Sequence, residues 1–291
     1  MKKLISLFLG VSVLLLAACS KQPDTASSEQ KNDAAGLQTV VIASTGSDAD
    51  IWRHIASLPE TKAAGIKLEV KNFTDYVAMN TAVANKEVDL NAFQSYAYLV
   101  AFNAANKDKI APVSTTYLEP MGIYSNKVKK VEEFAQGATI AIPNDGANES
   151  RALLLLQSAG LIKLKPDFDP VKGTPADIIE NSKKIVIKPI QMATAVRVKD
   201  EVDAILLGNT LAMEGGLNVL KDAIFYEPID QSTKLNVNIL ATAESRKDDP
   251  VLQKVGALYH TEAVKHYVQE HFAGTKVDVN KPTSYLTEAN P

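Results

Sequence analysis

The sequence predicts an α/β protein of two related lobes, and three features of the chain lead to this prediction. A short apolar strand, a polar turn and a helix follow one another at 39–57, and the same order returns at 140–157. Two further segments, 86–93 and 200–207, each follow an amphipathic helix and each resemble a strand. Polar residues close these strands, at Asn91 and Gln94 in one and at Asn209 in the other. Strand–turn–helix units repeated in the same order are typical of α/β lobes.

The first residues have the pattern of an export signal. Lys2 and Lys3 precede an apolar run at 4–18, which is too short for a stable membrane span. The residues Leu16-Ala17-Ala18-Cys19 resemble the cleavage site of bacterial lipoproteins, in which the cysteine becomes the lipid-carrying N-terminus. We therefore expect a signal peptide at 1–18 and lipidation at Cys19, the one cysteine of the sequence. The alternative is an ordinary secretory signal followed by a stray thiol.

Residues 20–36 include no large apolar side chain, so we expect a disordered, lipid-anchored tether at 19–36. The folded part then starts near Leu37 and is long enough for one large or two small domains. The whole sequence has 31 basic and 34 acidic residues, a net charge of −3. This balance argues against nucleic acid or a polybasic membrane contact as partners, so the lipid would be the link to a membrane.

The segment 140–157 is the strongest functional signal. A buried strand breaks at Pro143, and a turn of small polar residues leads into an apolar helix. A helix N-terminus offers unpaired N–H groups and the positive end of the dipole, and Arg151 adds a fork that fits a carboxylate. The pattern predicts an anion site, although a helix capped by Asn148 with a solvated Arg151 is the alternative.

Aromatic and amide residues follow the two predicted strands at 67–70 and 86–93, within the segments Phe73–Tyr76 and Asn91–Leu99. An aromatic wall with a few fixed polar groups is typical of a site for a small, partly apolar ligand, although any single ring is more often core. Ligands of open α/β sheets lie at the carboxyl ends of strands, so two facing lobes would form a cleft. Two independent domains without a shared site are the alternative.

The motifs of the sequence give no support for an enzyme. The sequence has no Gly-rich phosphate loop and no His-Glu-x-x-His, and Asp89 and Asp203 are interpreted as structural. Three of the four histidines fall on a predicted helix at 251–272 and do not align as metal ligands, so we expect surface residues. We predict no catalytic residue, no cofactor and no metal.

From about Thr39 to Phe272 the chain resembles the methionine-binding lipoproteins of the MetQ/NlpA family, the ligand-capturing components of ABC importers. The most specific pieces are Phe73–Tyr76, Asn91–Gln94 and Pro143–Arg151, and Gly160–Leu164 and Asn209-Thr210 add to them. The resemblance implies a periplasmic-binding-protein fold with two α/β lobes around a ligand cleft. It implies lobe I at 37–121 and 238–291, lobe II at 122–237, and crossings near Met121–Ser125 and Asn238–Thr242.

The resemblance also implies roles for individual residues. Arg151 would bind the α-carboxylate of an amino acid, with Asn148 beside it. Asn209 and Asn238 would hold the head group, and Tyr76, Phe93 and Tyr98 would form the aromatic side-chain pocket. The chain departs from the family at Ser95, where a His usually follows the Gln. A hydroxymethyl group enlarges the pocket and changes its hydrogen bonding, so methionine, another amino acid, a D-isomer and a small peptide all stay open as ligands.

The sequence therefore predicts a binding protein of the bacterial cell envelope, lipid-anchored on the periplasmic or extracellular face. It would close on an amino-acid ligand and deliver it to the permease of an ABC importer. A surface adhesin on the same fold is an alternative, and a hydrolase is a more distant one.

Overall fold

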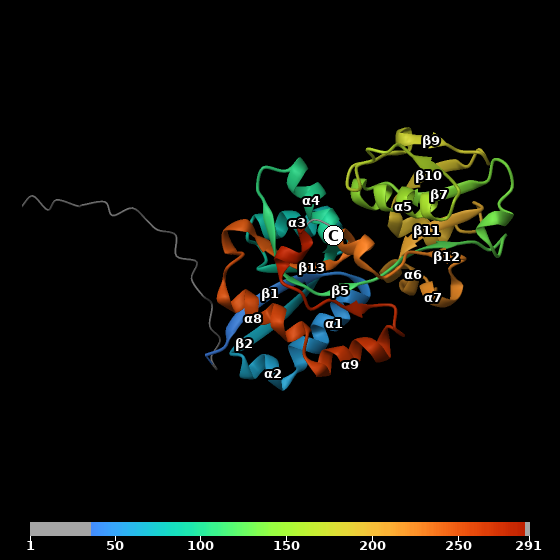
Figure 1. The fold of residues 1–291 in the computed structure, drawn as a ribbon. Helices are drawn as coiled ribbons and strands as arrows, with labels where there is room; N and C mark the ends of the chain where they lie inside the picture. Colours follow the sequence, from blue (N-terminus) through green and yellow to red (C-terminus); the bar gives the residue numbers. More distant parts are fainter. Residues whose placement is uncertain (1–35, 289–291) are drawn as a thin grey trace, which may run out of the picture. The chain divides into compact units, whose positions relative to one another are not determined.

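The computed structural model describes residues 36–288, so the predicted signal peptide, the lipid on Cys19 and nearly all of the predicted tether lie outside the described residues. Within 36–288 the chain forms two five-stranded sheets and two small two-stranded sheets (Figure 1). None of the helices in this range is long and apolar enough to cross a membrane.

The first five-stranded sheet has the strand order β2-β1-β3-β13-β4. β1 pairs in parallel with β2 and β3, whereas β13 pairs antiparallel with β3 and β4. Figure 1 accordingly shows orange β13 beside the blue and teal part of the chain. The strands are β1 (Gln38–Ser44), β2 (Ile66–Asn72), β3 (Leu90–Ser95), β4 (Ile110–Thr115) and β13 (Asn238–Ala243).

Helices cover both faces of this sheet because its strands are buried on both sides. Val40 and Ile42 of β1 pack in one apolar cluster with α1, α8 and α9, while Ala43 packs in another with α3 and α4. This alternation follows from the period of two along a strand. The helices are α1 (Gly46–Ser57), α2 (Pro59–Ala63), α3 (Tyr76–Ala84), α4 (Tyr96–Ala105), α8 (Pro250–Tyr259) and α9 (Glu262–His271).

The second five-stranded sheet has the order β10-β7-β11-β6-β12. β7 is parallel to β10 and β11, and β6 is antiparallel to β11 and β12. Its strands are β6 (Met121–Tyr124), β7 (Thr139–Pro143), β10 (Val186–Ile190), β11 (Ala204–Gly208) and β12 (Phe225–Tyr226). α5 (Gly146–Ser158) packs in one apolar cluster, and α6 (Asn209–Glu214) and α7 (Val219–Asp222) pack in the other. The predicted α/β class with two sheet-containing lobes is confirmed.

Short elements complete the described chain. β5 (Tyr117–Leu118) pairs with β14 (Val277–Asp278), and β8 (Lys163–Leu164) pairs with β9 (Ile178–Glu180). The 3₁₀ turns are η1 (Val131–Glu133), η2 (Pro175–Asp177), η3 (Met192–Val198), η4 (Gln231–Asn236), η5 (Glu244–Arg246) and η6 (Thr283–Leu286).

Two aspartates make the same contact with a neighbouring strand, one in each five-stranded sheet. Asp89, just before β3, accepts a hydrogen bond from the backbone N–H of Val41 at 2.8 Å. Asp203, just before β11, accepts one from the N–H of Thr139 at 2.8 Å. In each pair the aspartate N–H also donates to the carbonyl of the same partner, at 2.9 and 2.8 Å. Each carboxylate therefore satisfies a strand N–H, which is a structural role as expected.

Three predicted elements differ from the structure. The strands expected at 86–93 and 200–207 begin only at Leu90 and Ala204, and Lys86 has a φ of 62°, a turn conformation that a strand excludes. The helix expected at 251–272 is two helices, α8 and α9, separated at His260. His260 is not a surface residue: its Nδ1 lies 2.7 Å from Asp278 Oδ1 and its Nε2 lies 3.0 Å from the carbonyl oxygen of Thr115.

The chain passes between the two five-stranded sheets just before the segments predicted as crossings. Met121–Tyr124 and Asn238–Ala243 are strands within a sheet, so the connections are residues 116–120 and 227–237. The family resemblance implied crossings at both segments, but each forms a strand that is buried in its own sheet. The lobe bounds at 37–121, 122–237 and 238–291 stay a prediction, and the sheet strands agree with them except that Met121 belongs to β6.

Candidate ligand-binding pocket

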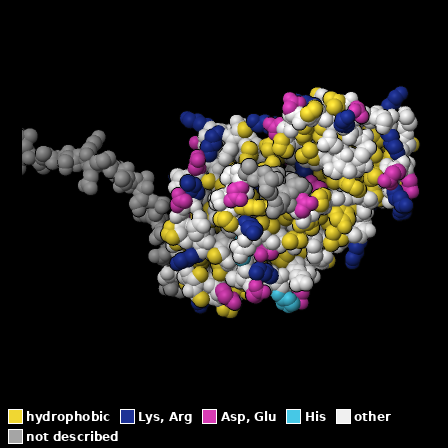
Figure 2. Space-filling view, in the orientation of Figure 1, with side chains coloured by type: hydrophobic (Ala, Val, Ile, Leu, Met, Phe, Trp, Pro, Cys, Tyr) yellow, Lys and Arg dark blue, Asp and Glu magenta, His cyan; other side chains and the backbone are white. Residues whose placement is uncertain are grey.

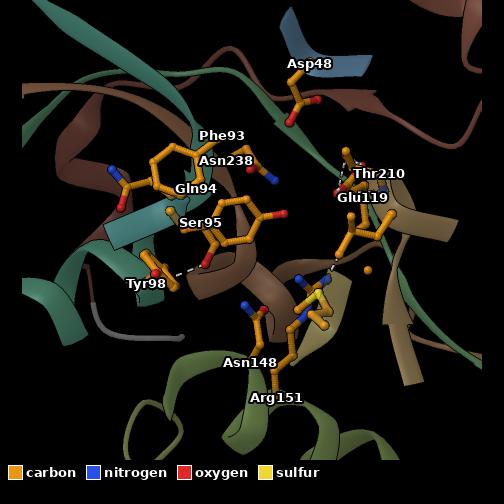
Figure 3. A pocket seen from close by; sticks show the side chains of 14 residues that line it. Asp48, Phe93, Gln94, Ser95, Tyr98, Glu119, Asn148, Arg151, Thr210 and Asn238 are labelled. Carbon is orange, nitrogen blue, oxygen red and sulfur yellow. Dashed lines mark hydrogen bonds between the residues drawn. The ribbon is translucent and has the colours of Figure 1, made fainter. Parts of the chain in front are cut away.

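A pocket lies at the carboxyl ends of β3 and β11, between the elements of the two sheets (Figure 3). Strand ends of open α/β sheets are where ligands bind, as predicted. The lining residues are Asp48, Tyr76, Phe93, Gln94, Ser95, Tyr98, Glu119, Asn148, Arg151, Met192, Gly208, Thr210, Leu211 and Asn238. Seven of the eight predicted contact residues are thus brought together, and Asn209 is the exception.

Three aromatic rings form one wall of the pocket. Tyr76 opens α3, Phe93 lies on β3, and Tyr98 lies in the first turn of α4. The ring centroids are 5.1 Å apart for Tyr76 and Phe93, 5.8 Å for Phe93 and Tyr98, and 6.2 Å for Tyr76 and Tyr98. Tilted and edge-on rings at these distances attract one another, so the wall is held by its own packing.

A buried amide cluster fixes the strand that carries this wall. Asn80 of α3 donates to Gln94 Oε1 at 2.9 Å and accepts from Gln94 Nε2 at 2.7 Å and from Asn91 Nδ2 at 2.8 Å. Gln94 Nε2 also donates to Asn91 Oδ1 at 2.8 Å. The three side chains are at most 2% exposed, so their mutual hydrogen bonds replace water. Asn91 and Gln94 are therefore structural partners of Asn80.

Ser95 lines the pocket and is also the N-cap of α4. Its Oγ accepts a hydrogen bond from the backbone N–H of Tyr98 at 3.2 Å. A serine hydroxyl keeps one proton to donate after it has accepted as a cap. The hydroxyl can therefore orient Tyr98 and still donate toward a ligand.

The anion site at the start of α5 stays a prediction, and an acidic side chain of the protein itself lies there. The N-cap is Asp145 rather than Asn148, and its Oδ1 accepts from Asn148 N at 3.1 Å and from Asn148 Nδ2 at 2.9 Å. α5 starts at Gly146, so Arg151 lies beyond the first turn. An aspartate is a good cap for the same electrostatic reason that a ligand anion would bind there.

Arg151 reaches the pocket with most of its guanidinium already engaged. Its Nε lies 2.9 Å from Glu227 Oε1, and its Nη2 lies 2.6 Å from Glu227 Oε2 and 2.8 Å from the carbonyl oxygen of Glu119. Arg151 is 7% exposed and Glu227 is 6% exposed. Within residues 36–288, Nη1 has no hydrogen-bond partner, so this group is the part of Arg151 that a ligand could still use.

A second charge cluster includes two residues that line the pocket, Asp48 and Glu119. Lys276 Nζ is 2.9 Å from Asp48 Oδ1, 2.5 Å from Glu119 Oε2 and 2.8 Å from Thr210 Oγ1. It also lies 3.9 Å from the centroid of the Tyr117 ring. We call Asp48, Glu119 and Lys276 the buried ion triad; each is at most 7% exposed.

The members of the triad titrate differently. Burial raises the pKa of Asp48 above its usual range, although Lys276 opposes this, and the neighbouring Glu119 raises it further. Burial also acts to raise the pKa of Glu119, but Lys276 and the amide of Asn209 outweigh it and hold that pKa below its usual range. Lys276 and the hydroxyl of Tyr117 also stabilise the Asp48 carboxylate, but burial and the charge of Glu119 outweigh them.

The two predicted head-group asparagines have different surroundings. Asn209 is fully buried and donates to Glu119 Oε2 at 3.2 Å and to Thr275 Oγ1 at 2.9 Å, so it supports the triad rather than lining the pocket. Asn238 lines the pocket at 6% exposure, and its side chain has no hydrogen bond to any of the described residues. The amide of Asn238 can therefore bond to a ligand in the pocket without giving up a protein partner.

Comparison with known proteins identifies the family. A family model described as NlpA lipoprotein matches residues 40–280. The chain belongs to the NlpA lipoprotein family. It is 35% identical over 272 residues to the probable D-methionine-binding lipoprotein MetQ of Pasteurella multocida (strain Pm70), covering 94% of this chain and 96% of that protein. It is 37% identical over 275 residues to outer membrane lipoprotein 2 of Mannheimia haemolytica, covering 94% and 97%.

A solved structure agrees with this assignment. The nutrient-binding protein of Burkholderia cenocepacia bound to methionine is 34% identical, with a TM-score of 0.76, and the match covers 82% of this chain and 99% of that one. The predicted family resemblance is confirmed.

For this NlpA lipoprotein, sequence reasoning did not find the buried ion triad. Asp48 and Lys276 are 228 residues apart, and no local pattern connects them. One signal was present: Asp48 follows the turn after the first strand, at the same kind of strand end as the predicted contacts. Across residues 36–288 no group of three His, Cys, Asp or Glu side chains is arranged to hold a metal ion.

Surface charge is mixed on the face drawn in Figure 2. Basic and acidic side chains are interspersed over that face. This distribution is consistent with the net charge of −3.

Proposed function

We propose that this NlpA lipoprotein captures methionine, or an amino acid closely related to it, and delivers it to the permease of an ABC importer. The observation that carries the proposal is the combination of an aromatic wall with two unengaged polar groups, Arg151 Nη1 and the Asn238 amide, in one pocket. The names of the relatives, a D-methionine-binding lipoprotein and a methionine-bound nutrient-binding protein, support the same ligand class.

In this proposal the aromatic wall of Tyr76, Phe93 and Tyr98 packs on the apolar thioether side chain. Sulfur beside aromatic rings gains about 0.3–1.5 kcal/mol per contact, which favours a thioether over an aliphatic chain of the same length. Arg151 Nη1 and Asn148 lie on the side that would take the carboxylate, with Asn238 holding the head group. Asn209 acts indirectly, through Glu119.

Ligand capture would bring the two lobes together. Thr210 of α6 already meets Lys276, which follows α9, and the carboxylate of Glu214 meets the backbone N–H of Ser47 at the start of α1. Such contacts between elements of the two sheets support a closed form in which ligand is shielded from water. The expected activity is stoichiometric binding without turnover.

We also propose that the protein is anchored in the cell envelope by a lipid on Cys19. The names of its relatives as lipoproteins, one of them an outer membrane lipoprotein, support this. Replacing Cys19 by Ala should move the protein from the membrane fraction to the soluble fraction, and retention in the membrane would contradict the anchor.

Isothermal titration of the ligand-free, purified lipoprotein with L- and D-methionine, other amino acids and small peptides tests the ligand class. We expect one-to-one binding of a methionine isomer, and Phe93→Ala should weaken it by about 1–3 kcal/mol through loss of apolar contact. Absence of binding by both methionine isomers, with binding of another compound, would overturn the methionine assignment.

A further inference from the structure

Another pocket lies at the end of the second five-stranded sheet that is remote from the ligand-binding pocket. β6 runs antiparallel to β11, and Met121 at its start pairs with Gly208, which lines the ligand-binding pocket. Tyr124 at the end of β6 pairs with Ile205, so this end of the strand points away from that pocket. Tyr124, the loop after β6, the residue after η3 and the residues around α7 line the remote pocket.

Three lysines from separate segments line this pocket, which we call the lysine pocket. Lys129 lies in the loop after β6, Lys199 follows η3, and Lys221 lies in the last turn of α7. None of the three ammonium groups pairs with a carboxylate of the described chain. Asp222 is the one acidic side chain among the described residues of the lining, which therefore has a formal charge of +2. This local charge is opposite in sign to the net charge of the whole sequence, −3.

The carboxylates near the lysine pocket bond to other groups. Asp222 Oδ2 accepts a backbone N–H from the residue before α7 at 2.7 Å. Asp200 Oδ1 accepts Asn126 Nδ2 at 2.5 Å, and Glu133 Oε2 accepts the backbone N–H of Lys129 at 2.9 Å. The three ammonium groups therefore keep positive charge that a ligand can meet.

The buried part of the lysine pocket includes a hydroxyl without a protein partner. Tyr124 is 1% exposed and packs in one apolar cluster with Ile205 and Val219. Its hydroxyl is buried and has no hydrogen bond to any residue of 36–288. Burial raises the pKa of Tyr124, so the hydroxyl keeps its proton and can donate it in a hydrogen bond. Because folded proteins satisfy nearly all their buried polar groups, this hydroxyl indicates an acceptor that the described chain does not supply.

We propose that the lysine pocket binds a phosphate group, which accepts hydrogen bonds from Lys129, Lys199 and Lys221 and from the buried hydroxyl of Tyr124. Ammonium groups act as compact point charges and suit a phosphate approached from several sides, whereas a planar carboxylate is better matched by the fork of an arginine. A phosphate monoester carries between one and two negative charges near neutral pH, which is close to the formal charge of the lining. The phosphate of a soluble molecule and that of an anionic phospholipid headgroup share this chemistry. The site is separate from the one proposed for methionine, so either proposal can fail without the other.

Titrations of the purified lipoprotein at constant ionic strength test the inference and distinguish the two sources of phosphate. The probes are inorganic phosphate and, as short-chain lipids that stay monomeric in solution, dihexanoylphosphatidylglycerol and dihexanoylphosphatidylcholine. Saturable binding of inorganic phosphate supports a soluble source. Binding of the phosphatidylglycerol alone supports an anionic lipid headgroup. Absence of binding by both, or equal binding of the two lipids without binding of inorganic phosphate, would overturn the phosphate site and leave methionine capture intact.

A pair of neighbouring lysines locates the binding. Lys129→Gln should weaken binding of the phosphate probe by about tenfold, the value of one hydrogen bond to a charged group. Lys130→Gln is the matched control, because Lys130 is exposed, carries the same charge one residue further on, and does not line the lysine pocket. Equal weakening by the two variants would mean that phosphate responds only to the net charge of the protein, and would overturn the site.

Tyr124→Phe distinguishes a hydroxyl that binds ligand from one with a structural role. The variant keeps the ring and the charge of the pocket, and we expect phosphate to bind about two- to tenfold more weakly. Without phosphate its stability should equal or exceed that of the natural chain, because the hydroxyl has no hydrogen bond to a described residue. An unchanged affinity for phosphate would contradict the role of Tyr124, all the more if stability falls. If this variant does not fold, the comparison of Lys129→Gln with Lys130→Gln still decides whether the lysine pocket is the site.

Discussion

Arg151 both pairs with Glu227 and lines the pocket. Its Nε and Nη2 hold Glu227, which itself accepts the backbone N–H of Met121 at 2.8 Å, and so tie α5 to both connections between the sheets. Among the guanidinium nitrogens, Nη1 alone has no hydrogen bond to the part of the chain that the structure describes. An arginine fixed in this way is a well-oriented donor, but the carboxylate of Glu227 already neutralises most of its charge.

We therefore expect Arg151→Ala to affect folding more than binding. Loss of the guanidinium leaves Glu227 buried and unpaired, which should lower the free energy of unfolding by about 3–5 kcal/mol. Methionine binding should weaken by about 1.5 kcal/mol, the value of one hydrogen bond to a charged group. Urea unfolding and titration of the folded variant measure the two effects. Arg53→Ala, which breaks an exposed pair, is the control and should change stability by less than about 1 kcal/mol. A larger loss in binding than in stability would mean that the ligand, rather than Glu227, is the main partner of Arg151.

Ser95 is the position where ligand choice should be most open to change. Its hydroxyl leaves room that an imidazole would fill, and it caps α4 through Tyr98 N. Ser95→His should shift preference toward methionine among a panel of amino acids, at a stability cost of about 1 kcal/mol for the lost cap. Ser95→Ala is the control, because it removes the same cap without filling the pocket. Competition titrations give the ligand profiles, and identical profiles for the natural chain and both variants would show that Ser95 does not set specificity.

At the scale of elements, the sequence predicts the ends of the strands well. Aromatic residues near the ends of β2 and β3 are recognisable in the sequence, and Tyr76, Phe93 and Tyr98 all line the pocket. The alternative in which Asn148 caps α5 is wrong, because the cap is Asp145; both residues suit an N-cap, and sequence alone does not fix where the helix begins. Asn80 was not recognised, because an asparagine in a helix reveals nothing of its partners on a strand.

The Asn80 cluster is the element-scale link between α3 and β3. Asn80→Ala removes the partner of two buried amides, Asn91 and Gln94, and each unsatisfied amide costs about 1–3 kcal/mol. We expect a loss of about 2–5 kcal/mol in the free energy of unfolding, together with weaker ligand binding as the aromatic wall loosens. Asn85→Ala at the end of the same helix is the matched control, since Asn85 bonds only the exposed Glu87 side chain by its own amide. Equal stability of the two variants would contradict the structural role of the cluster.

At the scale of the whole molecule, the buried ion triad joins parts of the chain that no local pattern connects. Asp48 lies on α1, Glu119 on the first connection between the sheets, and Lys276 follows α9, while Thr210 belongs to the second sheet's α6. The family resemblance predicted the two lobes and the cleft but not this cluster. Contacts of this kind depend on the assembled fold. The sequence therefore predicted the strand ends but not the buried ion triad.

Replacing Lys276 by Met should reveal the triad through the pH dependence of stability. Without the ammonium, Asp48 and Glu119 repel each other in a buried site, and the pKa of each carboxyl is expected to rise above its unfolded value of about 4. A carboxyl whose folded pKa is raised contributes stability at low pH and loses it as the pH rises through the folded pKa. Lys276→Met should therefore be less stable than the natural chain by about 3–5 kcal/mol near neutral pH, and the gap should narrow in mild acid.

Urea unfolding at a series of pH values measures this gap. Lys265→Met is the control, because Lys265 pairs with Glu262 at the surface, where solvent screens the pair. If the difference in stability between Lys276→Met and the natural chain stays constant with pH, the loss of Lys276 does not raise the pKa of Asp48 or Glu119. Because the triad links α1 to α6 across the pocket, the same variant should also bind ligand more weakly. That loss should persist at the acidic pH where stability recovers, since methionyl packing cannot replace the hydrogen bond from Lys276 to Thr210.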